Sequence, residues 1–136
     1  MKVNVHLNFN GQCEEAFRFY EECLGAKITF MLNHGDSPMA GQVPVEWHSK
    51  IMHATLTVDG TELTGADSPP GVYEKPGGFC VSLGVFDEGD AERIFQALAE
   101  KGKVQMALQP TFWTRRFGMV VDRFGIPWMI NCENSG

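Results

Sequence analysis

Two histidines lie in stretches where apolar and polar residues alternate, VNVHLNF and KIMHATLTV. Side chains at alternate positions of a β-strand point to the same side, so His6 shares a polar face with Asn8, and His53 shares one with Thr55. An imidazole can donate or accept a hydrogen bond, act as a general base near neutral pH, or bind a metal ion. We therefore assign these four residues to a ligand pocket, with His53 as a candidate catalytic base. A purely structural hydrogen bond remains the alternative for each histidine.

Four further residues complete the candidate pocket: Glu62, Cys80, Trp113 and Met129. Glu62 closely follows a turn dipeptide, Asp-Gly, so its carboxylate is either a pocket acid with a catalytic role or a solvated hairpin residue. No Lys or Arg lies beside Cys80 in the sequence to lower the pKa of its thiol, which favours a packed thiol over a nucleophile. Trp113 lies in the turn-rich stretch QPTFWTRRFG, where it either forms an aromatic wall of the pocket or covers the core.

The composition excludes several classes of protein. The chain has 136 residues, of which 43% are hydrophobic and 21% charged, and this suits a compact fold rather than a disordered chain. The formal net charge of −6 removes the electrostatic attraction to nucleic acids and anionic membranes, so we expect neither as a partner. The N-terminal stretch lacks the apolar core of a signal peptide, and the four cysteines form no CxxC pair. We expect a cytoplasmic protein with reduced thiols.

The same order of elements occurs twice along the chain. The hydrophobic patterns predict strands at Val3–Phe9, Ala26–Leu32, Lys50–Val58 and Thr61–Ala66 with a helix at Gln12–Leu24, and then strands at Phe79–Phe86, Val104–Leu108, Met119–Val121 and Pro127–Cys132 with a helix at Glu88–Lys101. Equivalent positions are 74 residues apart for His6 and Cys80 and 77 apart for Gly25 and Gly102. We predict an α+β fold of two βαβββ modules in one domain, 1–67 and 79–136, joined by a linker at 68–78. A generic α+β domain of the ferredoxin-like kind is the alternative.

Loops and turns complete the prediction. The segment between Leu32 and Lys50 is the longest loop and the best candidate for a mobile flap over a site. Asp122 with Gly125 is typical of a turn, and Trp128 alternates toward the core.

Seven stretches stand out along the chain: LNFNG, EEAFRFYEECLGA, KIMHATLTVDGTEL, GADSPPG, VSLGVFDEGDAERIF, LQPTFWTRRFG and DRFGIPW. They cover nearly the whole chain and resemble, in the family's order, the PhnB-like group of the vicinal oxygen chelate superfamily, which includes glyoxalases, bleomycin-resistance proteins and extradiol dioxygenases. The resemblance implies a half-open, eight-stranded cup with helices outside, a small-molecule ligand in the cup, and a homodimer.

The resemblance also locates the positions where related enzymes bind a metal ion. In those enzymes the first and fourth strands of each module each contribute one ligand, and these positions fall on His6, Glu62, Cys80 and Met129. A thioether suits Cu(I) and not the divalent metals of this superfamily, so Met129 departs from the pattern. We therefore expect no cofactor; if a divalent metal binds, its ligands are His6 and Glu62.

The expected function is binding of a small organic ligand in the cup without a tightly held metal. One alternative is a metal-dependent lyase, isomerase or dioxygenase that uses His6 and Glu62, and another is a resistance-type protein that only sequesters a compound. Some PhnB-like proteins carry a ubiquinone-methyltransferase label. The chain has no glycine-rich loop between a strand and a helix to bind a methyl donor, which argues against methyl transfer.

Overall fold

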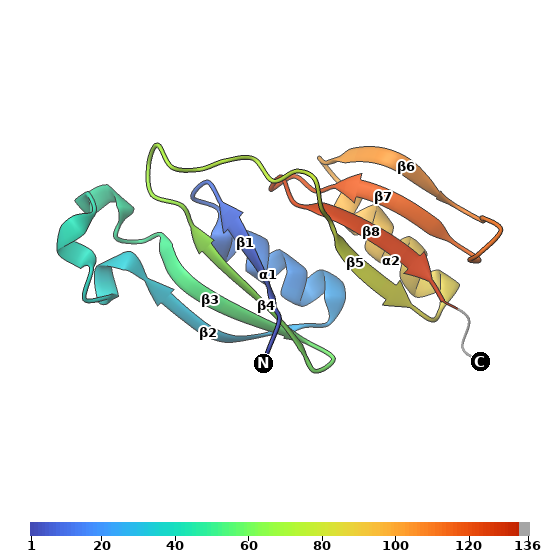
Figure 1. Ribbon diagram of the computed structural model, residues 1–136, viewed down its shortest axis with the longest axis horizontal. Coiled ribbons are helices and arrows are strands. Elements are labelled where there is room, and N and C mark those ends of the chain that lie inside the picture. The colour runs from blue at the N-terminus through green and yellow to red at the C-terminus, as the bar shows by residue number, and fades with distance from the viewer. Residues whose placement is uncertain (134–136) are drawn as a thin grey trace. The chain divides into compact units, whose positions relative to one another are not determined.

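The computed structural model describes residues 1–133 and divides into two compact units, Met1–Glu74 and Lys75–Gly136. The first unit contains β1 (Val5–Phe9), α1 (Cys13–Leu24), β2 (Lys27–Asn33), β3 (Ile51–Val58) and β4 (Thr61–Asp67). The second contains β5 (Val81–Val85), α2 (Glu88–Ala99), β6 (Lys103–Gln109), β7 (Phe117–Val121) and β8 (Pro127–Cys132). Each unit has the predicted order of one strand, one helix and three strands (Figure 1).

The strands of each unit form one mixed sheet. The strand order is β1-β4-β3-β2 in the first sheet and β5-β8-β7-β6 in the second. In both, the first strand of the unit pairs in parallel with the last, and the remaining pairs are antiparallel. The shared order confirms the predicted α+β fold of two βαβββ modules.

Helix α1 packs on one side of the first sheet. Its buried residues recur at the spacing of an amphipathic helix: Cys13, Ala16, Phe17, Tyr20 and Cys23. Gly65 in β4 permits the close packing, because a Cβ atom there would lie 2.7 Å from the ring of Phe17. Gly25, with φ of 66°, ends the helix in the left-handed conformation that glycine adopts without strain.

Helix α2 covers the second sheet in the same way. The Asp87 carboxylate caps its first turn by accepting a hydrogen bond of 3.0 Å from the backbone N–H of Asp90. The helix ends at Ala99, two residues earlier than predicted, and Lys101 adopts the left-handed conformation with φ of 56°. Gly102, the residue equivalent to Gly25 in the repeat, therefore does not end this helix. Gly102 is required for another reason, since a Cβ atom there would collide with the carbonyl oxygen of Val121.

Alternation along the strands separates a covered face from an open face in the first sheet. The side chains toward α1 are buried and apolar: Leu7, Phe9, Ala54, Leu56 and Leu63. The residues that alternate with them point away from the helix. They include His6 on β1 and His53 on β3. The hairpin between β3 and β4 turns at Asp59 and Gly60, with φ of 45° and 82°, as the Asp-Gly signal predicts.

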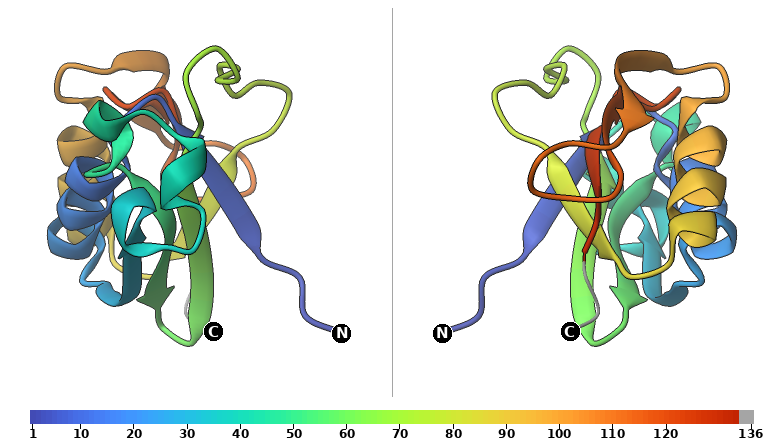
Figure 2. Two further views of the ribbon diagram at one scale, coloured as in Figure 1. Left: turned by 90° about the vertical axis from the view of Figure 1, so that its left-hand side faces the viewer. Right: turned by 90° about the vertical axis from the view of Figure 1, so that its right-hand side faces the viewer.

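Several strand boundaries differ from the prediction by one or two residues. Strand β4 extends through Asp67, one residue beyond its predicted end at Ala66, and β7 begins at Phe117 rather than Met119. The loop after β2 contains three short 3-10 turns, at His34–Asp36, Ala40–Gln42 and Val45–Trp47 (Figure 2). Backbone hydrogen bonds from His34 to Lys50 and from Gly35 to His48 fasten this loop at its base.

Three cysteines, Cys13, Cys23 and Cys132, are buried thiols. Burial, and then the negative charges of Asp67 and Glu14, raise the pKa of the Cys13 thiol far above its ordinary value, so this thiol stays protonated. Within residues 1–133, neither helix has the length and apolar character that a membrane crossing requires.

Candidate functional site

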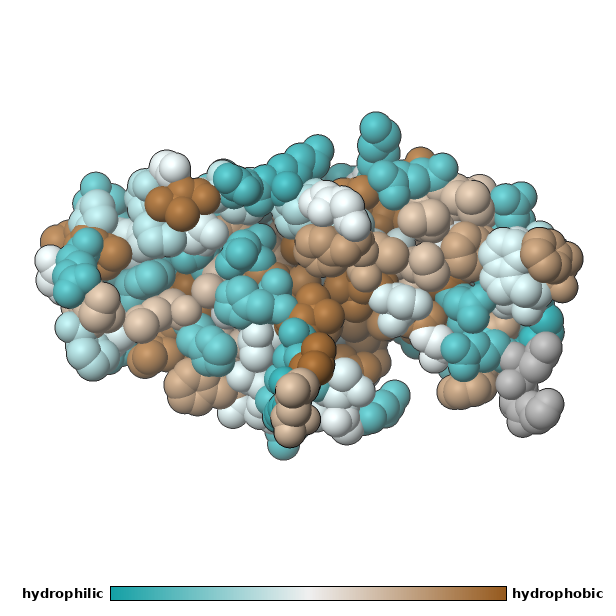
Figure 3. Space-filling model, viewed as in Figure 1, coloured by the Kyte–Doolittle hydropathy of each residue, from teal (hydrophilic) through white to brown (hydrophobic). Residues whose placement is uncertain are grey.

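The open face of the first sheet brings together side chains from three neighbouring strands. His6 on β1 and Thr64 on β4 share a hydrogen bond of 2.8 Å between Nδ1 and Oγ1. The ring of His53 on β3 stacks with that of His6, with centroids 6.3 Å apart and planes 15° apart. The strand order explains the contact, because β4 lies between β1 and β3. The two predicted histidines thus belong to one cluster, on a face that mixes polar and apolar residues (Figure 3).

Phe30 on β2 adds an aromatic ring to this cluster. Its centroid lies 5.8 Å from that of His53, and 49% of the residue is exposed. Phe30 was not among the predicted residues, because a register shift between Ile28 and Phe30 interrupts the alternation of β2. Thr64 was not predicted either, although it is two residues from Glu62 and therefore on the same face of β4.

Asn8 and Thr55, the other predicted residues of this face, border the cluster. Burial is the main cause that lowers the pKa of His6, and the charge of His53 lowers it further, while a hydrogen bond with the Asn8 side chain raises it. Thr55 is buried and pairs across the sheet with Thr64. The lowered pKa keeps the His6 imidazole uncharged at neutral pH, so that it can both donate and accept a hydrogen bond.

Substitutions of its two neighbours are expected to shift the pKa of His6 in opposite directions. His53→Gln removes a positive charge that opposes protonation of His6, so the pKa of His6 should rise. Asn8→Ala removes the hydrogen bond that favours the protonated form, so the pKa should fall. Titration of the His6 Hε1 resonance by NMR measures both shifts. The control is His48→Gln, which changes a ring that is hydrogen-bonded to the Ala40 carbonyl oxygen and should leave the pKa of His6 unchanged. Shifts of the same sign in His53→Gln and Asn8→Ala would contradict the assignment.

Glu62 lies on the same face of β4 as Thr64, two residues away. Its carboxylate forms an ion pair with the ammonium group of Lys2, near the end of the hairpin. Both alternatives for Glu62, the pocket acid and the hairpin residue, stay predictions. Within the described residues 1–133, no group of three or more His, Cys, Asp or Glu side chains is placed to hold a metal ion.

The second unit holds the three remaining candidates, of which Cys80 lies outside the strand predicted for it. Met129 lies on the open face of β8, and its Sδ accepts a hydrogen bond of 3.7 Å from the Ser82 hydroxyl. Cys80 lies one residue before β5 rather than inside a strand, because β5 begins at Val81. Cys80 is half-buried and lines a cavity together with Lys75, Lys101 and Lys103. None of these lysines is a sequence neighbour of Cys80, so the sequence alone did not indicate them.

Trp113 is 53% exposed, so its side chain is not buried as a cover of the core. Its ring contacts Phe112 and Phe117 edge-on, with centroids 4.8 Å and 5.3 Å away. The indole that fills the core of the second unit is Trp128, which is completely buried as predicted. Trp113 therefore keeps an open aromatic surface, as the wall alternative requires.

Comparison with known proteins places the chain in a family. Residues 5–130 match the family model described as the Glyoxalase/Bleomycin resistance protein/Dioxygenase superfamily. Protein YjdN of Escherichia coli (strain K12) is 33% identical over 139 residues, which cover 96% of this chain and 95% of YjdN. The chain belongs to the glyoxalase/bleomycin resistance protein/dioxygenase superfamily, as its resemblance in sequence implied.

Solved structures agree with this assignment. The crystal structure of protein PA1353 from Pseudomonas aeruginosa is 47% identical, with a TM-score of 0.90 and 99% of each chain covered. A PhnB protein from Bacillus cereus, whose name also carries a 3-demethylubiquinone-9 3-methyltransferase label, is 23% identical with a TM-score of 0.83, covering 98% of this chain and 100% of its own. The likeness to this second structure concerns the fold alone.

Proposed function

We propose that this chain is a PhnB-like protein that binds a small organic ligand on the open face of its first sheet, without a tightly held metal ion. The observation that carries the proposal is the cluster of His6, Thr64 and His53, with the exposed ring of Phe30 beside it. Small-molecule sites commonly combine aromatic surface with a few convergent hydrogen-bonding groups. This face offers both within four neighbouring strands.

The chemistry of the cluster favours an uncharged, planar compound with carbonyl or hydroxyl oxygens. The lowered pKa of His6 removes a positive charge that an anion would need. The Thr64 hydroxyl and the imidazole nitrogens can hydrogen-bond to the oxygens of the ligand. The rings of Phe30 and His53 can stack against its plane.

The donor set does not fit a divalent metal ion. His6 and Glu62 are the two candidate ligands of the first unit, too few for a divalent metal ion, and the Glu62 carboxylate is paired with Lys2. Met129, at another position where related enzymes bind metal, carries a thioether that suits soft Cu(I). Metal-assisted chemistry through His6 and Glu62 is therefore not included in the proposal.

Elemental analysis tests the metal-free part of the proposal. Protein purified without chelators, and the same protein after incubation with Ni²⁺, Zn²⁺, Fe²⁺ or Mn²⁺ and desalting, should contain far less than one metal ion per chain. Stoichiometric metal that disappears in His6→Ala and in Glu62→Ala would contradict the proposal and support the metal-dependent enzyme. Asn8→Ala is the matched control on the same face, because an amide is a poor ligand for these metals.

The proposal retains two expectations that the resemblance and the composition support, a homodimer and a cytoplasmic location. Recovery of the compound distinguishes binding or sequestration from catalysis: a bound compound that is recovered unchanged indicates a binding or resistance-type protein. Conversion of that compound, lost in His53→Phe while binding is retained, would assign His53 a catalytic role, because phenylalanine keeps a ring for stacking but has no nitrogen to move a proton.

A further inference from the structure

A cavity in the second unit gathers basic side chains, although the chain as a whole has a net charge of −6. The cavity has a volume of about 760 Å³ and lies where β6 and β8 begin and β7 ends. Four of the 11 Lys and Arg residues of the chain line it: Lys75, Lys101, Lys103 and Arg123. Asp122 is the one acidic residue among the described residues that line it.

The positive charge of this cavity has little compensation inside the protein. In the part of the chain that the structure describes, no carboxylate lies within 4.0 Å of the ammonium groups of Lys75, Lys101 or Lys103. The Asp122 carboxylate is engaged elsewhere, because it accepts hydrogen bonds from two backbone N–H groups and from the Trp128 indole. The ammonium groups are therefore available to an anion from solution.

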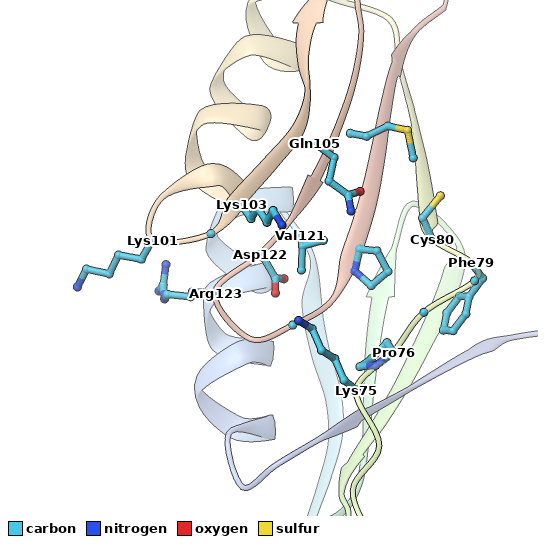
Figure 4. Close-up of a pocket in the computed structure, with 16 residues that line it drawn as sticks. Lys75, Pro76, Phe79, Cys80, Lys101, Lys103, Gln105, Val121, Asp122 and Arg123 are labelled. Atoms are coloured by element: carbon cyan, nitrogen blue, oxygen red, sulfur yellow. The ribbon is translucent and has the colours of Figure 1, made fainter.

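The orientation of the side chains gives the cavity a polar side and an apolar side (Figure 4). Lys75 and Lys103 extend toward the middle of the cavity, and the Gln105 amide points to the same region, whereas Lys101 points away. The apolar lining includes Phe79, Val121, Met119 and Pro127. An anion alone would leave this apolar surface uncovered.

We propose that this cavity binds a small organic molecule carrying a doubly charged oxyanion, either a phosphate ester or a dicarboxylate. The Lys75 and Lys103 ammonium groups neutralise the anion, the Gln105 amide donates a hydrogen bond to it, and the apolar lining holds the organic part. The volume lies within the range usual for small-molecule pockets. This site goes beyond the proposed function, because it lies within the second unit and selects for negative charge.

Isothermal titration calorimetry with two probes tests the proposal. Phenyl phosphate and phthalate both carry a benzene ring and two negative charges at pH 8, but they differ in the oxyanion. One or both should bind saturably with a Kd below about 1 mM at low ionic strength, and the affinity should fall as NaCl is added. The tighter probe identifies the source of the oxyanion, and phenol, which is uncharged below its pKa, should not bind at pH 8.

Charge-removing variants locate the site. Lys75→Gln and Lys103→Gln should each weaken binding about tenfold. The control is Lys27→Gln, which removes the same charge from an exposed position on β2 in the first unit and should change the Kd less than about twofold. Because all three lysines are exposed, the variants should keep the wild-type fold, which a ¹⁵N–¹H spectrum verifies. The proposal is overturned if neither probe saturates below about 10 mM, or if Lys27→Gln weakens binding as much as Lys103→Gln.

Discussion

Replacing Asp122 by alanine is expected to lower the free energy of unfolding by about 4 kcal/mol. The carboxylate is 3% exposed, and Oδ1 accepts hydrogen bonds from the backbone N–H groups of Phe124 and Ile126 at 2.9 and 3.0 Å. Oδ2 accepts one of 2.8 Å from Nε1 of the buried Trp128. Alanine would leave these three donors buried without their acceptor. Chemical denaturation of the variant and the wild type measures the difference.

Asp122→Asn separates the two oxygens of this carboxylate. Its amide oxygen can still accept from the backbone, but its NH₂ group would face the N–H of Trp128, so the expected loss is about 2 kcal/mol. In the double variant Asp122→Asn, Trp128→Phe, the clash of donors is absent, and the total loss should be smaller than the sum of the single losses. Additive losses would contradict the role assigned to the indole hydrogen bond. The control is Asp59→Asn, in an exposed turn whose left-handed conformation asparagine also adopts, and it should be nearly neutral.

Asp67→Ala is expected to cost about 3 kcal/mol in the first unit. Asp67 is 2% exposed, and its two oxygens accept hydrogen bonds of 2.8 Å from the backbone N–H groups of Cys13 and Ile51. It therefore ties the end of β4 to the first residue of α1 and the first residue of β3. Because His53 is two residues after Ile51, loosening this junction should also shift the NMR resonances of His53. Thermal or chemical denaturation and a ¹³C–¹H spectrum of the histidine rings measure the two effects.

The matched control for this prediction is Asp36→Asn, which changes an exposed carboxylate in the loop between β2 and β3. It should alter the free energy of unfolding by less than about 0.5 kcal/mol. If Asp67→Ala unfolds at the same denaturant concentration as the wild type, the hydrogen bonds to Cys13 and Ile51 do not stabilise the unit.

Local sequence patterns were sufficient to predict which side chains share a face. Alternation placed His6 and His53 on polar faces, and the hydrophobic pattern placed a helix at Gln12–Leu24, one residue longer than the observed α1. The Asp-Gly turn likewise follows from backbone conformations that few residues adopt. Each of these features depends on residues close together in the chain.

Features that depend on distant parts of the chain were missed. Thr64 and Phe30 join the histidines through the pairing of β1 with β4 and of β2 with β3, which no local pattern encodes. The role of Asp67, beside the predicted linker, depends on the N–H groups of Cys13 and Ile51, which are 54 and 16 residues away in the chain. Lys75 and Lys103 likewise come together only in the folded second unit.

The claim that the histidine cluster is a ligand site is tested most directly by NMR of histidine-labelled protein during a screen of small aromatic compounds. The chain has four histidines, and His34 and His48, in the loop after β2, serve as internal controls for His6 and His53. We expect uncharged compounds with carbonyl or hydroxyl oxygens to shift the ring resonances of His6 and His53 in a saturable manner, and to shift those of His34 and His48 much less. Compounds that bind while the His6 and His53 resonances stay unchanged would contradict the account.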